Sequence, residues 1–258
     1  MPDATRRRQP AVRTTRRYGW LPDLPDKRDY PYSSVMRARP LPPTVDLRAK
    51  CPPVYSQGEL GSCTAHAIAA ALEFDQPEPR FVPSRLFIFY NERVLAGAEG
   101  SAGAHLRDGI RSVSTQGACK EDDWPYDPAQ DAVQPPQACY EQALGFKALT
   151  YYRLDQDIAQ FKTCLAEGFP FVFGFTAYAS FETEAVKTSG TLPMPQSDET
   201  VVGGHAVVAV GYDDASACVI ARNSWGPDWG QGGYFMMPYA YITDPQLACD
   251  FWTIRAVS

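Results

Sequence analysis

One stretch decides the fold of this chain: Gln-Gly-Glu-Leu-Gly-Ser-Cys-Thr-Ala-His, at residues 57–66. Two glycines interrupt the backbone before Cys63, and an apolar, alanine-rich run follows from residue 65 to residue 74. This pattern predicts a turn that places a thiol in the first turn of a helix. There the unpaired N–H groups and the positive end of the helix dipole favour the thiolate, which is the nucleophilic form of cysteine. A buried cysteine without chemistry is the ordinary alternative for Cys63 considered alone.

Two segments far downstream offer partners for such a thiol. His205 opens a β-branched run, residues 205–212, that is typical of a buried strand. Asn223 directly follows a second short strand, which is expected at residues 218–222. His205 follows Cys63 by 142 residues, and Asn223 follows His205 by 18. Considered singly, a core histidine and a turn asparagine would explain these two residues, but their order and spacing favour one catalytic site.

Together the three blocks resemble the signature of papain-type (C1 family) cysteine peptidases, in which histidine and asparagine follow the cysteine by about 130–150 residues. The resemblance covers roughly residues 41–258 and is nearest to the compact prokaryotic branch, here with a short N-terminal prosegment. It implies an α+β fold of two lobes, with helices in the first and an antiparallel sheet or barrel in the second. The active-site cleft would lie between the lobes, and the expected activity is that of a cysteine endopeptidase.

The resemblance also gives each candidate residue a role. Cys63 would attack the peptide carbonyl as thiolate and form an acyl-enzyme. His205 would pair with it as imidazolium and protonate the leaving amine, while Asn223 accepts the other ring N–H. Gln57 would donate its side-chain NH2 to the oxyanion, beside the backbone N–H of Cys63. Trp225 would cover the His–Asn hydrogen bond and border the substrate.

Substrate binding is expected at a small-residue pair, Gly103 and Ala104, which corresponds to the family's Gly-Gly pair. A small residue there lets an extended peptide approach as an added strand, although a simple helix-start turn is an equal alternative. The main specificity pocket would be neutral and partly apolar, which favours a hydrophobic side chain two positions before the scissile bond. Its expected border is formed by Gly203, Gly204, His105 and Leu106.

Three neighbours of the cysteine depart from the usual family pattern or need a separate interpretation. Leu60 stands where a disulfide cysteine is usual, and Thr64 replaces an aromatic residue after the nucleophile. Neither change removes a reacting group. His66 shares a helix face with Cys63, but it is expected to point inward as a packing residue and not to act as the base.

Cysteine usage and hydropathy give expectations about cofactors and location. No Cys-x-x-Cys occurs, so neither a metal nor a cofactor is expected, and six cysteines besides Cys63 leave any disulfide pairing open. No secretory leader or bilayer-length apolar run is visible. We therefore expect reduced thiols in a monomeric, cytoplasmic protein without membrane attachment, with non-standard secretion left open.

The first 40 residues are expected to form a basic, proline-rich arm or prosegment ahead of a peptidase domain at 41–258. Within that domain the helical lobe is expected at about 41–145 and the β lobe at about 146–258. Residues 1–17 hold one acid and six arginines, whereas the remaining chain has a net charge of about −11. Such a tail predicts disorder, with weak contact to a polyanion or to the acidic surface; a transit peptide is a lower alternative. The arginines are Arg6, Arg7, Arg8, Arg13, Arg16 and Arg17.

Residues 18–40 are dense in proline and aromatic side chains, which excludes a regular helix and favours extended chain. We hypothesise that this segment crosses the cleft or its rim and restrains substrate entry as an intramolecular inhibitor. A packed arm without regulatory function is the alternative.

Two other classes of function remain open at this stage. One is a papain-fold deamidase or acyl transferase acting on glutamine side chains, and the other is a binding module whose site its own N-terminus covers.

The remaining chain predicts helices first and strands later, without internal repeats. Helices are expected at 63–74, 84–95, 104–115 and 156–167, with glycines 97, 117 and 168 as stops. Strands are expected at 171–175, 205–212, 218–222, 234–238 and 252–256.

Overall fold

The computed structural model describes residues 18–37, 39–98 and 101–258. The arginine-rich tail, for which disorder and polyanion contact were expected, lies outside the described residues.

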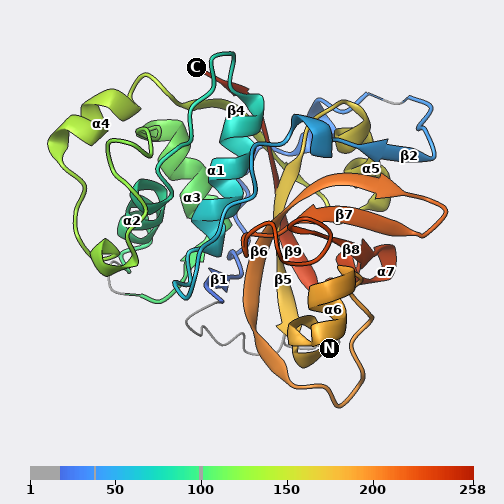
Figure 1. Cartoon of the computed structure of the whole chain (residues 1–258). Coiled ribbons are helices and arrows are strands. Elements are labelled where there is room, and N and C mark those ends of the chain that lie inside the picture. The colour runs from blue at the N-terminus through green and yellow to red at the C-terminus, as the bar shows by residue number, and fades with distance from the viewer. Residues whose placement is uncertain (1–17, 38, 99–100) are drawn as a thin grey trace, which may run out of the picture.

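The helices between residues 63 and 143 lie on one side of the molecule, and the later helices lie with most of the strands on the other, so the fold is the two-lobed α+β arrangement that the sequence predicts (Figure 1). The helices are α1 (Cys63–Asp75), α2 (Arg85–Leu95), α3 (Leu106–Thr115), α4 (Gln137–Ala143), α5 (Ile158–Ala166), α6 (Glu184–Ser189) and α7 (Tyr239–Ile242). Short 3-10 turns are η1 (Tyr32–Ser34), η2 (Arg48–Lys50), η3 (Pro128–Gln130) and η4 (Ala179–Glu182).

Within the described residues, the main sheet has the order β4-β9-β5-β6-β7-β8, with β2 beside β6, and its neighbouring strands are antiparallel. Its strands are β2 (Thr44–Asp46), β4 (Ala148–Leu154), β5 (Phe171–Tyr178), β6 (Val201–Asp213), β7 (Cys218–Arg222), β8 (Tyr234–Pro238) and β9 (Ala248–Val257). A separate parallel pair joins the N-terminal arm to the helical lobe: β1 (Trp20–Leu21) and β3 (Ala104–His105).

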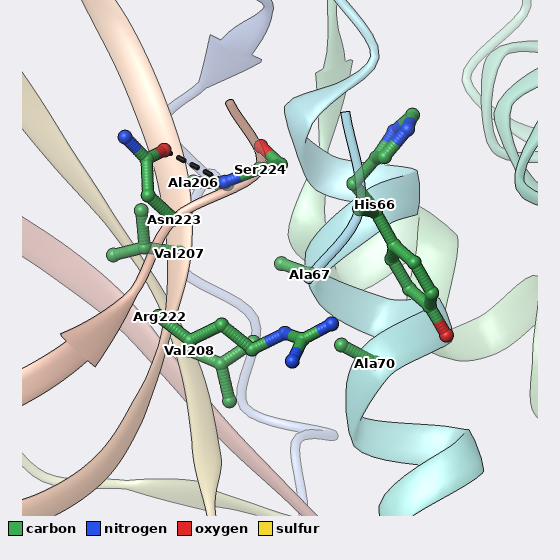
Figure 2. Close-up of a pocket in the computed structure, with 10 residues that line it drawn as sticks. His66, Ala67, Ala70, Ala206, Val207, Val208, Arg222, Asn223 and Ser224 are labelled. Carbon is green, nitrogen blue, oxygen red and sulfur yellow. Dashed lines mark hydrogen bonds between the residues drawn. The ribbon is translucent and has the colours of Figure 1, made fainter. Parts of the chain in front are cut away.

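Helix α1 is the central helix and is buried along nearly its whole length. Its alanines present little bulk, so the helix packs directly on β6. Figure 2 shows Ala67 and Ala70 of α1 facing Val207, Val208 and Arg222 of the sheet. The cavity between them has a volume of only about 10 Å³, counted as space for the centre of a water molecule, so it is too small for a substrate. The close packing brings the first residue of α1 to the strand that carries His205.

Several predicted element boundaries are confirmed, mainly where residues at the boundary itself determine the end of the element. Gly97, Gly117 and Gly168 all have positive φ, at 64°, 81° and 91°, and each stands just beyond a helix, as expected of stop residues. Strands β7 and β8 have the predicted bounds. The helix expected from residue 104 begins only at Leu106, because residues 104–105 are extended and pair with the N-terminal arm. Strands β1, β2, β3 and β4 and helices α4, α6 and α7 were not predicted.

Candidate active site

His205 and Asn223 form a buried hydrogen-bonded pair between adjacent strands of the sheet lobe. His205 Nε2 lies 2.8 Å from Asn223 Oδ1. The same oxygen accepts the backbone N–H of Ser224 at 2.8 Å (Figure 2), which identifies it as an acceptor. His205 Nε2 is therefore the protonated donor in the neutral ring. The asparagine thus fixes the tautomer in which Nδ1 is the basic nitrogen.

Aromatic rings enclose this pair. Trp225 lies closest to the imidazole, with ring centroids 5.1 Å apart and planes tilted by 35°. Phe175, Phe181 and Tyr18 follow at 5.6, 5.9 and 5.7 Å. The rings shield the His–Asn hydrogen bond from water, which is the arrangement expected around Trp225.

Cys63 is the first residue of α1, as predicted, and it is completely buried. Burial raises the pKa of its thiol to about 11, and the backbone N–H groups of Gly19, Ala206 and Thr64 only partly offset that effect. This outcome differs from the thiolate that the helix start favours, because burial removes the sulfur from water. Ala206 directly follows His205, so its contact places the sulfur beside the part of β6 that carries His205.

Gln57 is buried in the turn that leads to Cys63 and is tied to the opposite lobe. Its Oε1 accepts a hydrogen bond from Ser224 Oγ at 2.6 Å, and its Nε2 donates to the Leu60 carbonyl at 2.8 Å. Its backbone N–H donates to the Ser224 carbonyl at 2.9 Å. These bonds fix the amide between Leu60 and Ser224, the residue that follows Asn223.

His66 lies inside the helical lobe, as expected. Its Nδ1 is 2.9 Å from the Ser62 carbonyl oxygen and therefore donates to it. The ring packs edge-on against Tyr126, with centroids 4.8 Å apart. Burial, with a smaller effect of Arg85, lowers the pKa of His66 to about 3. The residue is thus a neutral packing group. Its neighbour Thr64 turns its hydroxyl to the buried Glu92, at 2.6 Å.

The backbone edge expected to bind substrate is occupied by the chain's own arm. The Ala104 N–H donates to the Gly19 carbonyl at 2.7 Å, and β1 pairs residue 20 with 104 and residue 21 with 105. His105 Nδ1 donates to the Leu21 carbonyl at 3.1 Å. Gly103 directly precedes this edge, whereas Gly204 lies in β6 opposite Thr176, one residue before His205.

Sequence reasoning expected residues 18–40 at the cleft or its rim without singling out Gly19 or Trp20, and it missed Gly174. A Cβ on Gly19 would lie 1.6 Å from the Gly61 carbonyl oxygen, and one on Gly174 would lie 1.9 Å from the Trp20 ring. Trp20 itself is only 1% exposed. A glycine within the bulky strand run of residues 171–175 is a signal of close approach, and it could have identified Gly174.

The remaining features are the cysteines, possible metal-binding groups and possible membrane-spanning helices. All seven cysteines are free thiols. Among the described residues, His, Cys, Asp and Glu side chains do not gather into any group of three that could hold a metal. In the same residues no helix combines the length and the apolar character needed to span a bilayer.

Comparisons with known proteins agree with this geometry. The family model for papain family cysteine proteases matches residues 41–248. The crystal structure of xylellain, a cysteine protease from Xylella fastidiosa, has 44% identity and a TM-score of 0.86 over 96% of this chain and 98% of that one. An uncharacterized peptidase C1-like protein of Acanthamoeba polyphaga mimivirus is 39% identical over 274 residues, which cover 95% of this chain and 88% of that protein. Cysteine proteinase 3 of Entamoeba histolytica is 27% identical over 202 residues; the match covers 76% of this chain and 62% of that protein.

Proposed function

Because the chain belongs to the papain family of cysteine proteases, we propose that it is an endopeptidase whose reacting groups are Cys63, His205, Asn223 and Gln57. The observation that carries this proposal is the buried hydrogen bond from His205 Nε2 to Asn223 Oδ1. It leaves Nδ1 as the basic nitrogen of a ring whose neighbour, Ala206, contacts the Cys63 sulfur.

In the proposed reaction His205 Nδ1 takes the thiol proton, and the Cys63 thiolate adds to the peptide carbonyl. The oxyanion accepts hydrogen bonds from the Cys63 backbone N–H and from the Gln57 amide, whose orientation Ser224 and Leu60 fix. The imidazolium protonates the leaving amine, and the acyl-enzyme forms. His205 then removes a proton from water, which hydrolyses the thioester and restores the thiol.

We further propose that residues 18–21 restrain this activity. Gly19 lies at the thiol, and the Tyr18 hydroxyl donates to Glu182 at 2.9 Å on the other side of the site. Burying the Trp20 ring removes roughly 200 Å² from water, which contributes on the order of 5 kcal/mol before the cost of ordering the segment. A substrate must displace this segment to reach Cys63.

An ionic cluster holds the arm just beyond the cleft. The Asp29 carboxylate bridges Arg107 and Arg153 at 2.7 and 2.8 Å. Asp23 accepts hydrogen bonds from the Arg107 backbone N–H and from Trp252 Nε1, at 3.2 and 3.1 Å. These contacts keep residues 18–21 close to the site even while they open, so the restraint is reversible.

Hydrolysis of an internally quenched peptide mixture by the full chain and by Cys63→Ala tests the peptidase proposal, with products identified by mass spectrometry. We expect new peptide termini from the full chain and none from the variant. Conversion of glutamine to glutamate without chain cleavage would instead support the deamidase. Turnover by neither protein, combined with peptide binding by both, would support the binding module.

A further inference from the structure

We propose that Tyr126 is a positioning residue of the oxyanion site, because its hydroxyl joins both ends of the turn that connects Gln57 to Cys63. The inference rests on the peptidase function proposed above, in which the Gln57 amide and the Cys63 backbone N–H bind one oxyanion. Tyr126 acts through Gln57 and not on the substrate itself.

The two hydrogen bonds of the Tyr126 hydroxyl have defined directions. The hydroxyl donates to the Gln57 carbonyl oxygen at 2.9 Å, since a carbonyl can only accept. A phenol carries one proton, so the second bond, of 2.7 Å, is donated by the Ser62 hydroxyl. Ser62 directly precedes the nucleophile. The Tyr126 hydroxyl therefore bridges the start of the turn, at residue 57, and its end, at residue 62.

The ring that carries this hydroxyl is held by its neighbours. His66 packs edge-on against the ring, and the Arg85 guanidinium lies 5.2 Å from its centroid. The Tyr126 backbone N–H donates to the Glu121 carboxylate at 2.8 Å, and Glu121 forms an ion pair with Arg85. Burial raises the pKa of Tyr126 to about 12, so the hydroxyl keeps its proton at neutral pH. Tyr126 thus provides a donor of fixed position to the turn.

Gln57 depends on this bridge for the position of its backbone. The Leu60 N–H is also directed at the Gln57 carbonyl oxygen, but at 3.4 Å, close to the long limit of a hydrogen bond. The Gln57 N–H donates to the Ser224 carbonyl of the sheet lobe at 2.9 Å. Tyr126 and Ser224 therefore hold the Gln57 backbone from the two lobes. Without the hydroxyl, we expect the turn to relax and the amide to lose its alignment with the Cys63 N–H.

Tyr126→Phe tests this inference, since it removes the hydroxyl and keeps the ring that packs against His66. The parent is the full chain carrying Gly19→Ala, in which the added methyl group is expected to displace the arm from the cleft. On one fluorogenic peptide, kcat should fall by roughly 10–100-fold, the scale of a catalytic group misplaced by up to about 1 Å, with KM changed much less. Tyr140→Phe is the matched control and should keep kcat, because it removes a partly buried hydroxyl of the same lobe that bonds to Asn91 instead.

Two further measurements distinguish positioning of Gln57 from general support of the fold. With Gln57→Ala in the same chain, Tyr126→Phe should leave kcat nearly unchanged, because no amide remains to be aligned. Alkylation of Cys63 by iodoacetamide displaces iodide and forms no oxyanion. The alkylation rate should therefore be nearly the same with and without Tyr126→Phe.

The outcomes separate this inference from the peptidase proposal. A Tyr126→Phe chain with the kcat of its parent would overturn the inference and leave the peptidase intact. A fall in kcat that persists with Gln57→Ala, or that the alkylation rate shares, would also overturn it, since Tyr126 would then only support the fold. A parent that cleaves no peptide would overturn the peptidase proposal as well. If Tyr126→Phe does not fold, Ser62→Ala breaks the bridge at its other end and should lower kcat without slowing alkylation.

Discussion

Gly19 crosses Gly61 so closely that a Cβ on Gly19 would lie 1.6 Å from the Gly61 carbonyl oxygen. This crossing occurs two residues before the nucleophile, where the Gly19 N–H also reaches the Cys63 sulfur. Only a residue without a side chain can pass there. The position at which the arm covers the thiol is therefore also the position at which the smallest substitution should displace it.

Gly19→Ala should activate the full chain. Since backbone atoms obstruct the added methyl group, we expect the arm to leave the cleft and kcat/KM on a fluorogenic peptide to rise at least tenfold. Gly145→Ala, whose Cβ has room, should leave kcat/KM unchanged. Unchanged activity in a Gly19→Ala chain that melts at the wild-type temperature would refute the restraint.

The two buried histidines should respond differently to substitution. In the Gly19→Ala background, His205→Ala removes the ring that Asn223 orients and should lower kcat at least 10³-fold, the scale of a lost general acid–base. His66→Phe preserves a packed ring against Tyr126 and should keep most of the activity. Steady-state kinetics of both variants on one peptide shows which histidine is the base. The reverse pattern would assign that role to His66.

Gln57→Glu tests the oxyanion role at nearly constant shape. The substitution keeps an oxygen that can accept from Ser224 Oγ but removes the N–H donors. We expect kcat to fall by roughly 10²–10³, with KM changed much less. Circular dichroism and the melting temperature verify that the fold is retained. A kcat within threefold of the parent would exclude Gln57 from the oxyanion site.

Asp250 should make stability depend on pH. Burial, with Asp23 as the next cause, raises its pKa from 3.8 to about 7, against the opposing effect of Arg153. The folded chain therefore binds more protons than the unfolded chain between pH 4 and 7, so this contribution is greatest in acid and is lost as the pH rises. Asp250→Asn suits the positive φ of 62° and should remove the effect.

The measurement is the free energy of unfolding of wild type and Asp250→Asn from pH 4 to 7. The free energy of unfolding of the variant should increase relative to that of wild type as the pH rises, by more than ~1 kcal/mol over the range. Asp228→Asn, at an exposed carboxylate, is the matched control. A difference that is constant with pH would show that Asp250 does not titrate in this range.

Spacing and local chemistry made much of the fold predictable. The Gly-rich turn before Cys63 and the stop glycines at 97, 117 and 168 act on neighbouring residues, so their effects are visible in the sequence. The β-branched run after His205 likewise identifies its own strand. The order of Cys63, His205 and Asn223 then identified the family that the comparisons show.

Features that depend on distant chain segments were not predictable in the same way. The helix dipole favours a Cys63 thiolate, but burial in the folded chain raises the pKa, and one of the N–H groups at the sulfur comes from Gly19, 44 residues away in sequence. Residues 104–105 are extended because the arm pairs with them, which no local pattern reveals. The close approach of the Trp20 ring to Gly174 likewise joins two segments that are far apart in the sequence.

The central claim is that Cys63 and His205 react as a pair that the arm keeps covered, and the alkylation rate of Cys63 tests it most directly. Peptide mass spectrometry would follow iodoacetamide modification at pH 7 in wild type, Gly19→Ala and Gly19→Ala/His205→Ala. Since burial holds the covered thiol near a pKa of 11, we predict slow labelling in wild type, at least tenfold faster labelling in Gly19→Ala, and loss of most of that gain without His205. Equal rates in all three chains would contradict the account.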